Sequence, residues 1–367
     1  MKKRKLDYAK SVNYSVIDPF KGLMQKSGLA TSVHLKREGF NEIQKSRGET
    51  AYVFDMGNHY LALVQEGLGS KNLVADQVGK FTGKSHYDLI AQDTVACIVN
   101  DLIAVGAKPL AVNAYWSMNQ YEWFNNKKRS EDLIKGWKKA CDIAGVSWGG
   151  GETQSLPDLV QKDKIELAGC GVGIIKPKNR LTLGDELKAG DAILLIESSG
   201  IHANGLSLAR KIAEKLPKGY KTKLPNGKTF GGSLLVPTYI YANLVQSFFK
   251  NKIDIHYMVN ITGHGWRKLM RANREFTYII DKVPKVQPLF EFIQQHSGNT
   301  ISEMYGTFNM GAGFAIYLPV KQVQTAQKIA KKNGFKSLFA GSVQKGPRQV
   351  IIKPRNITFN SSSLDLR

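Results

Sequence analysis

A short polar segment with a proline, Lys176-Pro-Lys-Asn-Arg180, divides the sequence into two halves that each mix strand-like and helix-like segments. Segments of this kind are typical of linkers between domains. The chain has 367 residues, which is more than one ordinary hydrophobic core accommodates. We therefore expect two domains, an N-terminal one over residues 1–175 and a C-terminal one over residues 176–367.

Apolar residues follow both helical and strand periodicity in this sequence. In the first half, their spacing predicts one helix over 93–105 and another over 130–144. Short apolar runs predict strands in both halves, at 60–64, 110–115, 165–175, 192–196, 278–280, 313–318 and 349–352. The fold class that we expect is α+β or α/β, with a mixed sheet packed with helices in each domain.

The composition argues against several classes of protein. No apolar run reaches the roughly 18 residues that a membrane-spanning helix requires. The first five residues, Met-Lys-Lys-Arg-Lys, resemble the start of a signal peptide, but polar sequence follows where its apolar region should begin. Cys97, Cys141 and Cys170 lie far apart in the sequence, which argues against a zinc site and a disulfide framework. We expect a cytoplasmic protein without membrane contact.

The charge balance is strongly basic. Lys and Arg number 52 against 30 Asp and Glu, so the formal net charge is +22. Such an excess attracts polyanions, and nucleic acid is the first partner to consider. However, the lysines are scattered, and no basic helix with interleaved aromatic residues is present. The pattern favours a basic solvated surface that also attracts phosphorylated small substrates, and it argues against a nucleic-acid partner.

Two carboxylates and an amide stand out in the predicted helix over 93–105. Asp93 and Asp101 are eight positions apart, so they project from nearly the same face of the helix, and Asn100 precedes the second of them. Unpaired carboxylates on an otherwise apolar helix are expensive to bury, and a hard cation such as Mg²⁺ would offset that cost. The alternative is that Asn100 and Asp101 only cap and bond neighbouring loops.

Glycine-rich loops carry two further carboxylates, Glu66 and Glu152. The first of these loops reads Glu66-Gly-Leu-Gly-Ser-Lys71, which resembles a phosphate cradle that ends in a cation. Its spacing differs from that of a Walker A motif. A tight turn with a surface lysine is the alternative interpretation.

The second half contains two loops with histidine. Ser198-Ser-Gly-Ile-His-Ala-Asn-Gly205 leads from a predicted strand into a predicted helix, where backbone amides favour a phosphate. His202 in this loop is a candidate base or phosphate ligand. His264 lies between glycines in Ile261-Thr-Gly-His-Gly-Trp266, which suggests close approach to a ligand. A hydrogen-bonding surface histidine is the simpler interpretation of each.

Several segments resemble one family in the same sequence order. Asn100-Asp-Leu-Ile-Ala-Val-Gly-Ala-Lys-Pro109 matches the D-x4-G-A-x-P signature of the AIR synthase family and its superfamily. Four further blocks agree: Gly150–Thr153, Ser198–Arg210, Leu235–Thr238 and Ile261–Gly263. Glu303-Met-Tyr-Gly-Thr-Phe-Asn-Met-Gly311 is close to a block that is particularly typical of AIR synthase. The resemblance spans about residues 60 to 352.

This resemblance implies a two-domain AIR-synthase-like fold and a homodimer that pairs N-terminal sheets and binds ATP nearby. It implies the ATP- and Mg²⁺-dependent closure of the imidazole ring of aminoimidazole ribonucleotide from formylglycinamidine ribonucleotide. The implied metal ligands are Glu66, Asp101 and Glu152. The residues implied at the ATP phosphates are Gly67, Gly69, Ser70, Lys71, Asp93 and Asn100. Those implied at the substrate are Ser199, His202, Asn204, Thr262 and His264, and those in catalysis are Lys71, Asp101 and His202.

Two loops depart from the family pattern. Gln65-Glu-Gly-Leu-Gly-Ser-Lys71 stands where the family usually has Thr-Asp-Gly-Val-Gly-Thr-Lys, so a glutamate replaces the aspartate. Gly263-His-Gly-Trp266 stands where Gly-Gly-Gly-Phe is usual. These changes motivate an alternative, a divergent paralogue that phosphorylates another amide or phosphate ester. A third hypothesis is a nucleic-acid-binding protein on an inactive enzyme scaffold, and the retained carboxylates argue against it.

Overall fold

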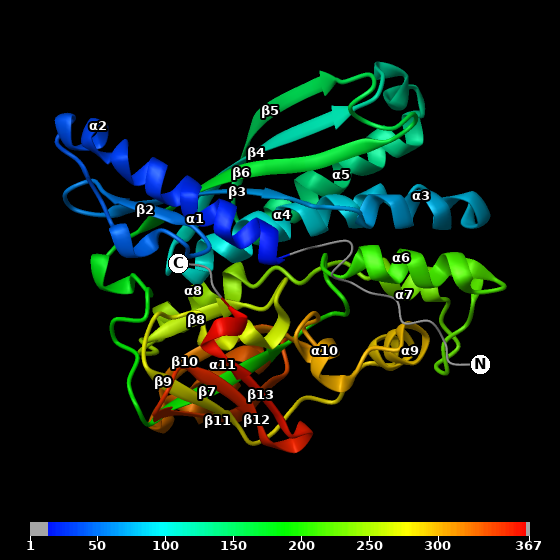
Figure 1. Ribbon diagram of the computed structural model, residues 1–367. Helices are drawn as coiled ribbons and strands as arrows, with labels where there is room; N and C mark the ends of the chain where they lie inside the picture. Colours follow the sequence, from blue (N-terminus) through cyan, green and yellow to red (C-terminus); the bar gives the residue numbers. More distant parts are fainter. Residues whose placement is uncertain (1–13, 365–367) are drawn as a thin grey trace.

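The computed structural model describes residues 14–364 as two mixed sheets, each packed with helices (Figure 1). The lysine-rich start of the chain lies outside the described residues. The first sheet has the strand order β1-β2-β3-β6-β4-β5, in which β4 and β5 are parallel and the other pairs antiparallel. Its strands are β1 (Asn41–Glu42), β2 (Tyr52–Asp55), β3 (Tyr60–Gly67), β4 (Lys108–Met118), β5 (Ser147–Ser155) and β6 (Ile165–Ile175). The helices of this half are α1 (Tyr14–Ala30), α2 (Ser32–Arg37), α3 (Lys71–Thr82), α4 (Tyr87–Ala104) and α5 (Lys127–Ala144).

The second sheet has seven strands in the order β13-β12-β9-β11-β7-β10-β8. Only the β9–β12 pair is parallel among these neighbours. The strands are β7 (Asp191–Glu197), β8 (Tyr257–Asn260), β9 (Phe276–Ile280), β10 (Ala312–Pro319), β11 (Ser337–Lys345), β12 (Gln349–Ile352) and β13 (Ile357–Asn360). The helices are α6 (Leu206–Lys215), α7 (Phe230–Leu234), α8 (Ala242–Lys250), α9 (Pro288–Ser297), α10 (Ile301–Tyr305) and α11 (Val323–Lys332). The predicted fold class is therefore confirmed.

None of the helices within residues 14–364 combines the length and the apolar character that crossing a bilayer requires.

Glycines in β6 allow α4 to pack unusually close to the first sheet. A Cβ atom at Gly171 would lie 2.5 Å from Cγ2 of Ile98 and 3.1 Å from Cδ1 of Leu102, both on α4. A Cβ at Gly169 would lie 2.9 Å from Cδ1 of Ile98. Real Cβ atoms do not approach so closely, so larger residues here would push the helix outward. The glycine-rich strand thereby sets the depth of the helix that carries Asp93, Asn100 and Asp101.

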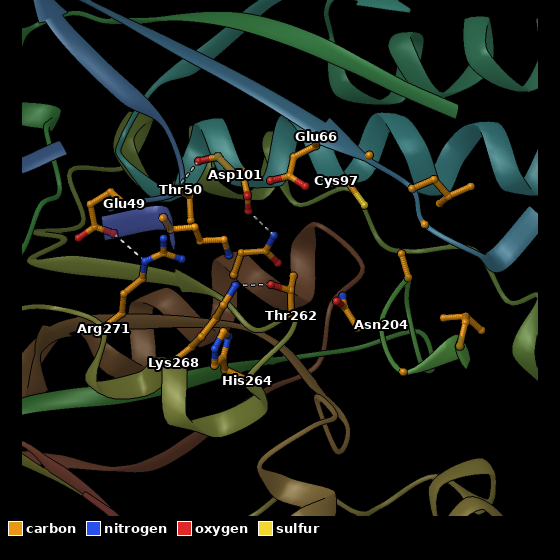
Figure 2. A pocket seen from close by; sticks show the side chains of 18 of the residues that line it. Glu49, Thr50, Glu66, Cys97, Asp101, Asn204, Thr262, His264, Lys268 and Arg271 are labelled. Carbon is orange, nitrogen blue, oxygen red and sulfur yellow. Dashed lines mark hydrogen bonds and ion pairs between the residues drawn. The ribbon is translucent and has the colours of Figure 1, made fainter. Parts of the chain in front are cut away.

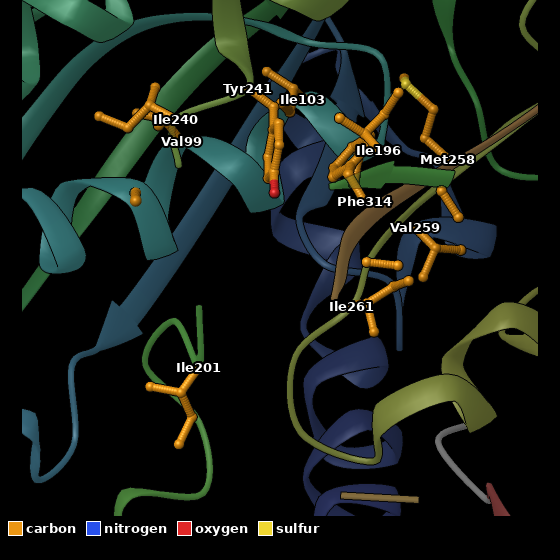
Figure 3. Close-up of a cluster of buried hydrophobic side chains, with 14 of the residues drawn as sticks. Val99, Ile103, Ile196, Ile201, Ile240, Tyr241, Met258, Val259, Ile261 and Phe314 are labelled. Atoms are coloured by element: carbon orange, nitrogen blue, oxygen red, sulfur yellow. The ribbon is translucent and has the colours of Figure 1, made fainter. Parts of the chain in front are cut away.

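Helix α4 also forms the main contact between the two domains. Val99 and Ile103 of α4 lie in one buried cluster with Tyr241 and with residues of β7, β8 and β10 (Figure 3). Gln92 of α4 donates a hydrogen bond to the backbone oxygen of Thr238, at 3.0 Å. This face of α4 is buried against the extended segment over 236–241 of the second domain. The helix predicted over 93–105 is the C-terminal part of α4.

Candidate functional site

A cavity of about 550 Å³ lies between the two domains. Its walls come from α1, from the loop between β3 and α3, from α4, from the loop before α6, and from β8 with the loop that follows it. This volume falls in the range of small-molecule sites, which are commonly found between domains. Figure 2 shows Glu66 and Asp101 on one side of the cavity, and Lys268 and His264 on the other side.

Two helices begin at the cavity. Gly67, Gly69 and Ser70 line it directly before α3, and Asn204, Gly205 and Ser207 line it at the start of α6. The turns that precede the helices require left-handed backbone at Gly69, with φ of 75°, and at Gly205, with φ of 77°. No side chain caps the start of either helix: Ser70 makes no capping hydrogen bond, and Gly205 has no side chain to make one. The first amides of two helices, with their positive dipole ends, therefore favour an anion in this cavity.

The acidic side of the cavity consists of Glu66 and Asp101. Asn260 of β8 donates a hydrogen bond from Nδ2 to Oδ1 of Asp101, at 2.7 Å, and Thr50 donates to the backbone oxygen of Asp101, at 2.7 Å. Burial and, to a lesser extent, the neighbouring Asp101 carboxylate together raise the pKa of Glu66 to about 8, against the opposing effect of Lys268. A bound cation would relieve this repulsion between carboxylates.

This donor set fits Mg²⁺ rather than a metal held entirely by protein. Within residues 14–364, no group of three or more His, Cys, Asp or Glu is placed to hold a metal ion. Mg²⁺ is usually bound through one or two carboxylates together with substrate phosphates and waters. Glu66 and Asp101 supply the two carboxylates, and the amides at the start of α3 and α6 lie in the same cavity to orient the phosphates.

The basic side of the cavity consists of Lys268, Arg271 and Lys21. Burial and, to a lesser extent, the positive charge of Arg271 together lower the pKa of Lys268 to about 8, against the opposing effects of Asp101 and Glu66. Arg271 is held in place because its Nε lies 3.1 Å from Oε2 of Glu49 and its Nη2 donates to the oxygen of Gly48, at 2.7 Å. Lys21 comes from α1, so that helix forms part of the cavity wall.

Three of the residues predicted at the substrate line the cavity: Asn204, Thr262 and His264. The imidazole Nε2 of His264 lies 3.5 Å from Oδ2 of Asp18, which is on α1. Burial and, to a lesser extent, the charge of Lys268 together lower the pKa of His264 to about 3. The imidazole is therefore neutral at physiological pH and offers hydrogen bonds rather than charge.

Lys71 and Asp93 lie outside the cavity, whereas the resemblance implies that they lie at the ATP phosphates. The Lys71 ammonium is fully buried and donates to Oδ1 of Asp93 and to the oxygen of Val236, both at 2.8 Å. Asp93 also accepts from the backbone N–H of Thr238, at 2.8 Å, and from its hydroxyl, at 2.5 Å. Neither side chain lines the cavity. The pair instead links α3 and α4 to the second domain, because Lys71 donates to Val236 and Asp93 accepts from Thr238.

Asn100 also lies in the contact between the two domains. Its Nδ2 donates to the oxygen of Tyr239, at 2.8 Å, and its Oδ1 accepts from the N–H of Tyr241, at 3.0 Å. Asn100 therefore joins the two domains and does not line the cavity, in contrast to its predicted place at the phosphates.

Ser199 and His202 lie behind the cavity wall. Ser199 Oγ donates to the oxygen of Pro237, at 2.6 Å, and the N–H of Ser199 donates to Nε2 of His202, at 3.3 Å. Only 2% of His202 is exposed, and burial lowers its pKa to about 3. Its Nε2 accepts a hydrogen bond within the loop before α6, and the side chain does not line the cavity.

Glu152 is separated from the other two predicted metal ligands. It is exposed on β5, and its Oε1 accepts from the N–H of Thr153, at 3.0 Å. In the sheet, β5 lies three strand positions away from β3, which ends at Glu66 and Gly67. Three strand spacings correspond to roughly 14 Å, so one chain does not bring Glu152 to Glu66 and Asp101.

Several cavity residues were not identified from the sequence. They are Lys21, Glu49, Thr50, Cys97, Asn260, Lys268 and Arg271. Cys97 is four positions before Asp101, one helical turn away on the same face, so its place could have been inferred. The others come from segments whose approach to the cavity depends on how the two domains pack.

The chain matches two family descriptions in succession. Residues 48–175 match "AIR synthase related protein, N-terminal domain". Residues 188–353 match "AIR synthase related protein, C-terminal domain". Together these matches cover most of the chain, and the linker predicted from the sequence lies between them.

The chain is also similar to named relatives in sequence and to solved structures in fold. The phosphoribosylformylglycinamidine cyclo-ligase of Methanocaldococcus jannaschii is 37% identical over 291 residues, which are 79% of each chain. That of Pyrococcus furiosus is 35% identical over 306 residues, 83% of this chain and 85% of the relative. The thiamine-monophosphate kinase from Stenotrophomonas maltophilia K279a has a TM-score of 0.60 at 17% identity, over 83% and 88% of the two chains. The hydrogenase maturation protein HypE in complex with ATP has a TM-score of 0.58 at 18% identity, over 79% and 81%.

Proposed function

Since this chain belongs to the AIR synthase related family, we propose that it is a phosphoribosylformylglycinamidine cyclo-ligase. It uses ATP to convert formylglycinamidine ribonucleotide into aminoimidazole ribonucleotide, with ADP and phosphate as the other products. The observation that carries this proposal is the cavity between the domains. Carboxylates, cations and the N-termini of two helices all line this cavity. Phosphoryl transfer requires such groups, because they position the phosphates and neutralise their charge.

The reaction has two steps, and the cavity suits the first in particular. The formyl amide oxygen attacks the γ-phosphorus of ATP, the bond to the ADP oxygen breaks, and an O-phosphorylated amide forms. The amidine-side nitrogen then attacks the same carbon and closes the ring, and inorganic phosphate leaves with the former amide oxygen. Mg²⁺ held by Glu66 and Asp101 would supply charge neutralisation at the phosphates.

The chain's own residues contribute position and charge. The amides at the starts of α3 and α6 point their positive dipole ends at phosphate oxygens. Asn204 and Thr262 line the cavity with groups that both donate and accept hydrogen bonds. Asn260 fixes the rotamer of Asp101 through its bond to Oδ1, so this carboxylate is oriented before a ligand binds.

A direct assay tests this proposal. Purified protein is mixed with formylglycinamidine ribonucleotide, ATP and Mg²⁺, and aminoimidazole ribonucleotide is measured as product. The Asp101→Asn variant should lose about 10²–10³-fold in turnover and melt at nearly the same temperature, because the amide keeps the size of the side chain. Absence of product from the wild-type protein would contradict the proposal.

Divergence at two loops supports one alternative, a paralogue that phosphorylates another amide or phosphate ester. His264 stands in the cavity at a position where the family usually has glycine, and Glu66 replaces an aspartate. Both changes alter the shape of the space around a substrate. ATP consumption that requires Asp101, without ring closure, would favour this alternative.

We also infer that the protein acts as a cytoplasmic homodimer. Leu63 of β3 is 48% exposed, on the face of the first sheet opposite α4. Along α1, four apolar side chains form a helical stripe that is more than half exposed: Val16, Phe20, Leu23 and Met24. The stripe on α1 is contiguous apolar surface of the kind typical of protein interfaces, and the paired sheets implied by the family would cover Leu63.

A further inference from the structure

Lys268 is a buried cation that has no carboxylate hydrogen-bonded to it in the described chain. It lies in a short 3-10 helix, Gly265–Met270, after the loop that contains Thr262 and His264. Only 8% of the residue is exposed, yet it lines the cavity between the domains. Within residues 14–364, the ammonium of Lys268 donates one hydrogen bond, to Oγ1 of Thr262. An ammonium has three donors, so two of them remain for a ligand.

Lys71 shows what a structural buried lysine looks like in this protein. Its ammonium contacts a buried carboxylate and a backbone oxygen, and it lies away from the cavity. Lys268 differs in both respects, because its bonded partner is a neutral hydroxyl and its ammonium lies at the cavity. A buried charge without a bonded counter-ion costs folding free energy, and an anionic ligand would offset that cost.

The place of Lys268 in the cavity indicates which anion would do so. It lies opposite the carboxylates of Glu66 and Asp101 (Figure 2). A phosphoryl group between the two sides would meet a metal-binding face on one side and an ammonium on the other. Arg271 and Lys21 are also at this cavity, but Arg271 already has its charge opposed by Glu49, and Lys21 is exposed to solvent. Lys268 is therefore the cation best placed to respond to a ligand.

We propose that Lys268 is a catalytic residue that donates hydrogen bonds to the phosphoryl group as it passes from ATP to the substrate oxygen. The inference rests on the proposed function, and it gives Lys268 the task at the phosphates that the resemblance implied for Lys71. The bond from γ-phosphorus to the ADP oxygen breaks while that to the amide oxygen forms. Lys268 keeps its proton throughout and neutralises charge on the three non-bridging oxygens, which move with the phosphorus from ADP to the amide oxygen.

The test compares Lys268→Met and Lys268→Arg with the wild-type protein. Lys268→Met should lower kcat about 10²–10³-fold and should weaken binding of the ATP analogue adenylyl imidodiphosphate with Mg²⁺ at least tenfold by calorimetry. Lys268→Arg keeps the positive charge, so its kcat and its affinity for the ATP analogue should lie between those of Lys268→Met and wild type. Lys45→Met is the matched control, because Lys45 is an exposed lysine paired with Asp185, and it should behave as wild type.

The outcomes separate this inference from the proposed function. Wild-type protein that makes no aminoimidazole ribonucleotide overturns the proposed function, and the analogue-binding measurement then decides on Lys268 alone. If Lys268→Met keeps both turnover and analogue affinity within about threefold of wild type, the role of Lys268 is refuted. If Lys268→Met melts far below wild type, Lys268→Arg decides. A folded arginine variant that loses less than about tenfold in analogue affinity and less than about 10²-fold in kcat supports the role of the charge, and a folded arginine variant that loses as much of both as is expected for Lys268→Met overturns it.

Discussion

Replacement of Lys71 by methionine is the sharpest test of how the two domains are held together. The ammonium of Lys71 and the carboxylate of Asp93 are both fully buried, 2.8 Å apart. Methionine is nearly isosteric with lysine, so Lys71→Met removes the charge and changes packing little. The variant leaves the Asp93 carboxylate buried without its counter-ion.

The expected loss of stability follows from that geometry. Removal of one partner of a buried ion pair typically costs about 3–5 kcal/mol. Asp93 keeps two hydrogen bonds from Thr238, which places the expected loss near the lower end, about 3 kcal/mol. For a domain of this size, that corresponds to a fall of roughly 6–12 °C in the melting temperature.

The loss should also depend on pH. Burial raises the pKa of Asp93, and Lys71 opposes that rise, so the pKa rises further in Lys71→Met. An acid whose pKa is raised in the folded state favours folding when it is protonated. The loss of stability caused by Lys71→Met should therefore shrink as the pH falls, and it should grow as the pH rises through the pKa of Asp93 in the folded variant.

Differential scanning calorimetry of four variants gives the measurement: Lys71→Met, Asp93→Asn, the double variant of the two, and Lys178→Met as the control. Lys178→Met removes a partly exposed ion pair with Asp55 and should cost less than about 1 kcal/mol. The double variant Lys71→Met/Asp93→Asn should be more stable than the sum of its single changes, because it leaves no unpaired charge. If Lys71→Met melts like wild type but loses turnover, the reasoning is refuted, and Lys71 acts at the phosphates as the sequence predicted.

Three further predictions concern packing, acid stability and assembly. Gly171→Val should destabilise the protein by about 1–3 kcal/mol in denaturant unfolding, since its Cβ would meet Ile98; an unchanged midpoint would contradict the close packing of α4. His202 has a pKa lowered to about 3, so stability should fall as the pH drops below 6.5, by about 3 kcal/mol at pH 4. His202→Asn, which suits the left-handed backbone there, should lose less on acidification, and an equal loss would refute the assignment. Leu63→Glu should convert a dimer to a monomer in analytical ultracentrifugation, whereas a dimer that persists would exclude this face of the sheet.

The sequence predicts the fold well, because its patterns are local. The apolar spacing over 93–105 and the glycine-rich run over 165–175 both correspond to elements of the structure, the end of α4 and β6. The order of family blocks adds the two-domain arrangement. Only tertiary packing reveals that the glycines of β6 and the helix α4 belong together, since they are about 70 positions apart in the sequence.

The site is predicted less completely, and α4 shows why. Eight positions separate Asp93 from Asp101, so the sequence correctly places them on similar faces of one helix. The helix is 18 residues long, and its two ends meet different neighbours. Asp101 reaches the cavity, whereas Asp93 meets Lys71 and Thr238 in the contact between domains. Helical periodicity specifies the face of a residue but not the partner that covers it.

Lys268 illustrates the opposite case, a residue that local pattern hides. It lies in the run Trp266-Arg-Lys-Leu-Met-Arg271, where two basic residues in succession are typical of a solvated surface. In the structure this run is a 3-10 helix that packs beside β8, with Leu269 and Met270 fully buried. The ammonium of Lys268 consequently lies at the boundary between the domains, which no local pattern specifies.

The most direct test of this account is a crystal structure with adenylyl imidodiphosphate and Mg²⁺. We predict that Mg²⁺ is bound by Glu66 and Asp101, and that the γ-phosphate oxygens lie within hydrogen-bonding distance of Lys268 and of amides at the start of α3 or α6. Phosphates bound outside the cavity, or bound at Lys71 after a rearrangement of the contact between domains, would contradict the account.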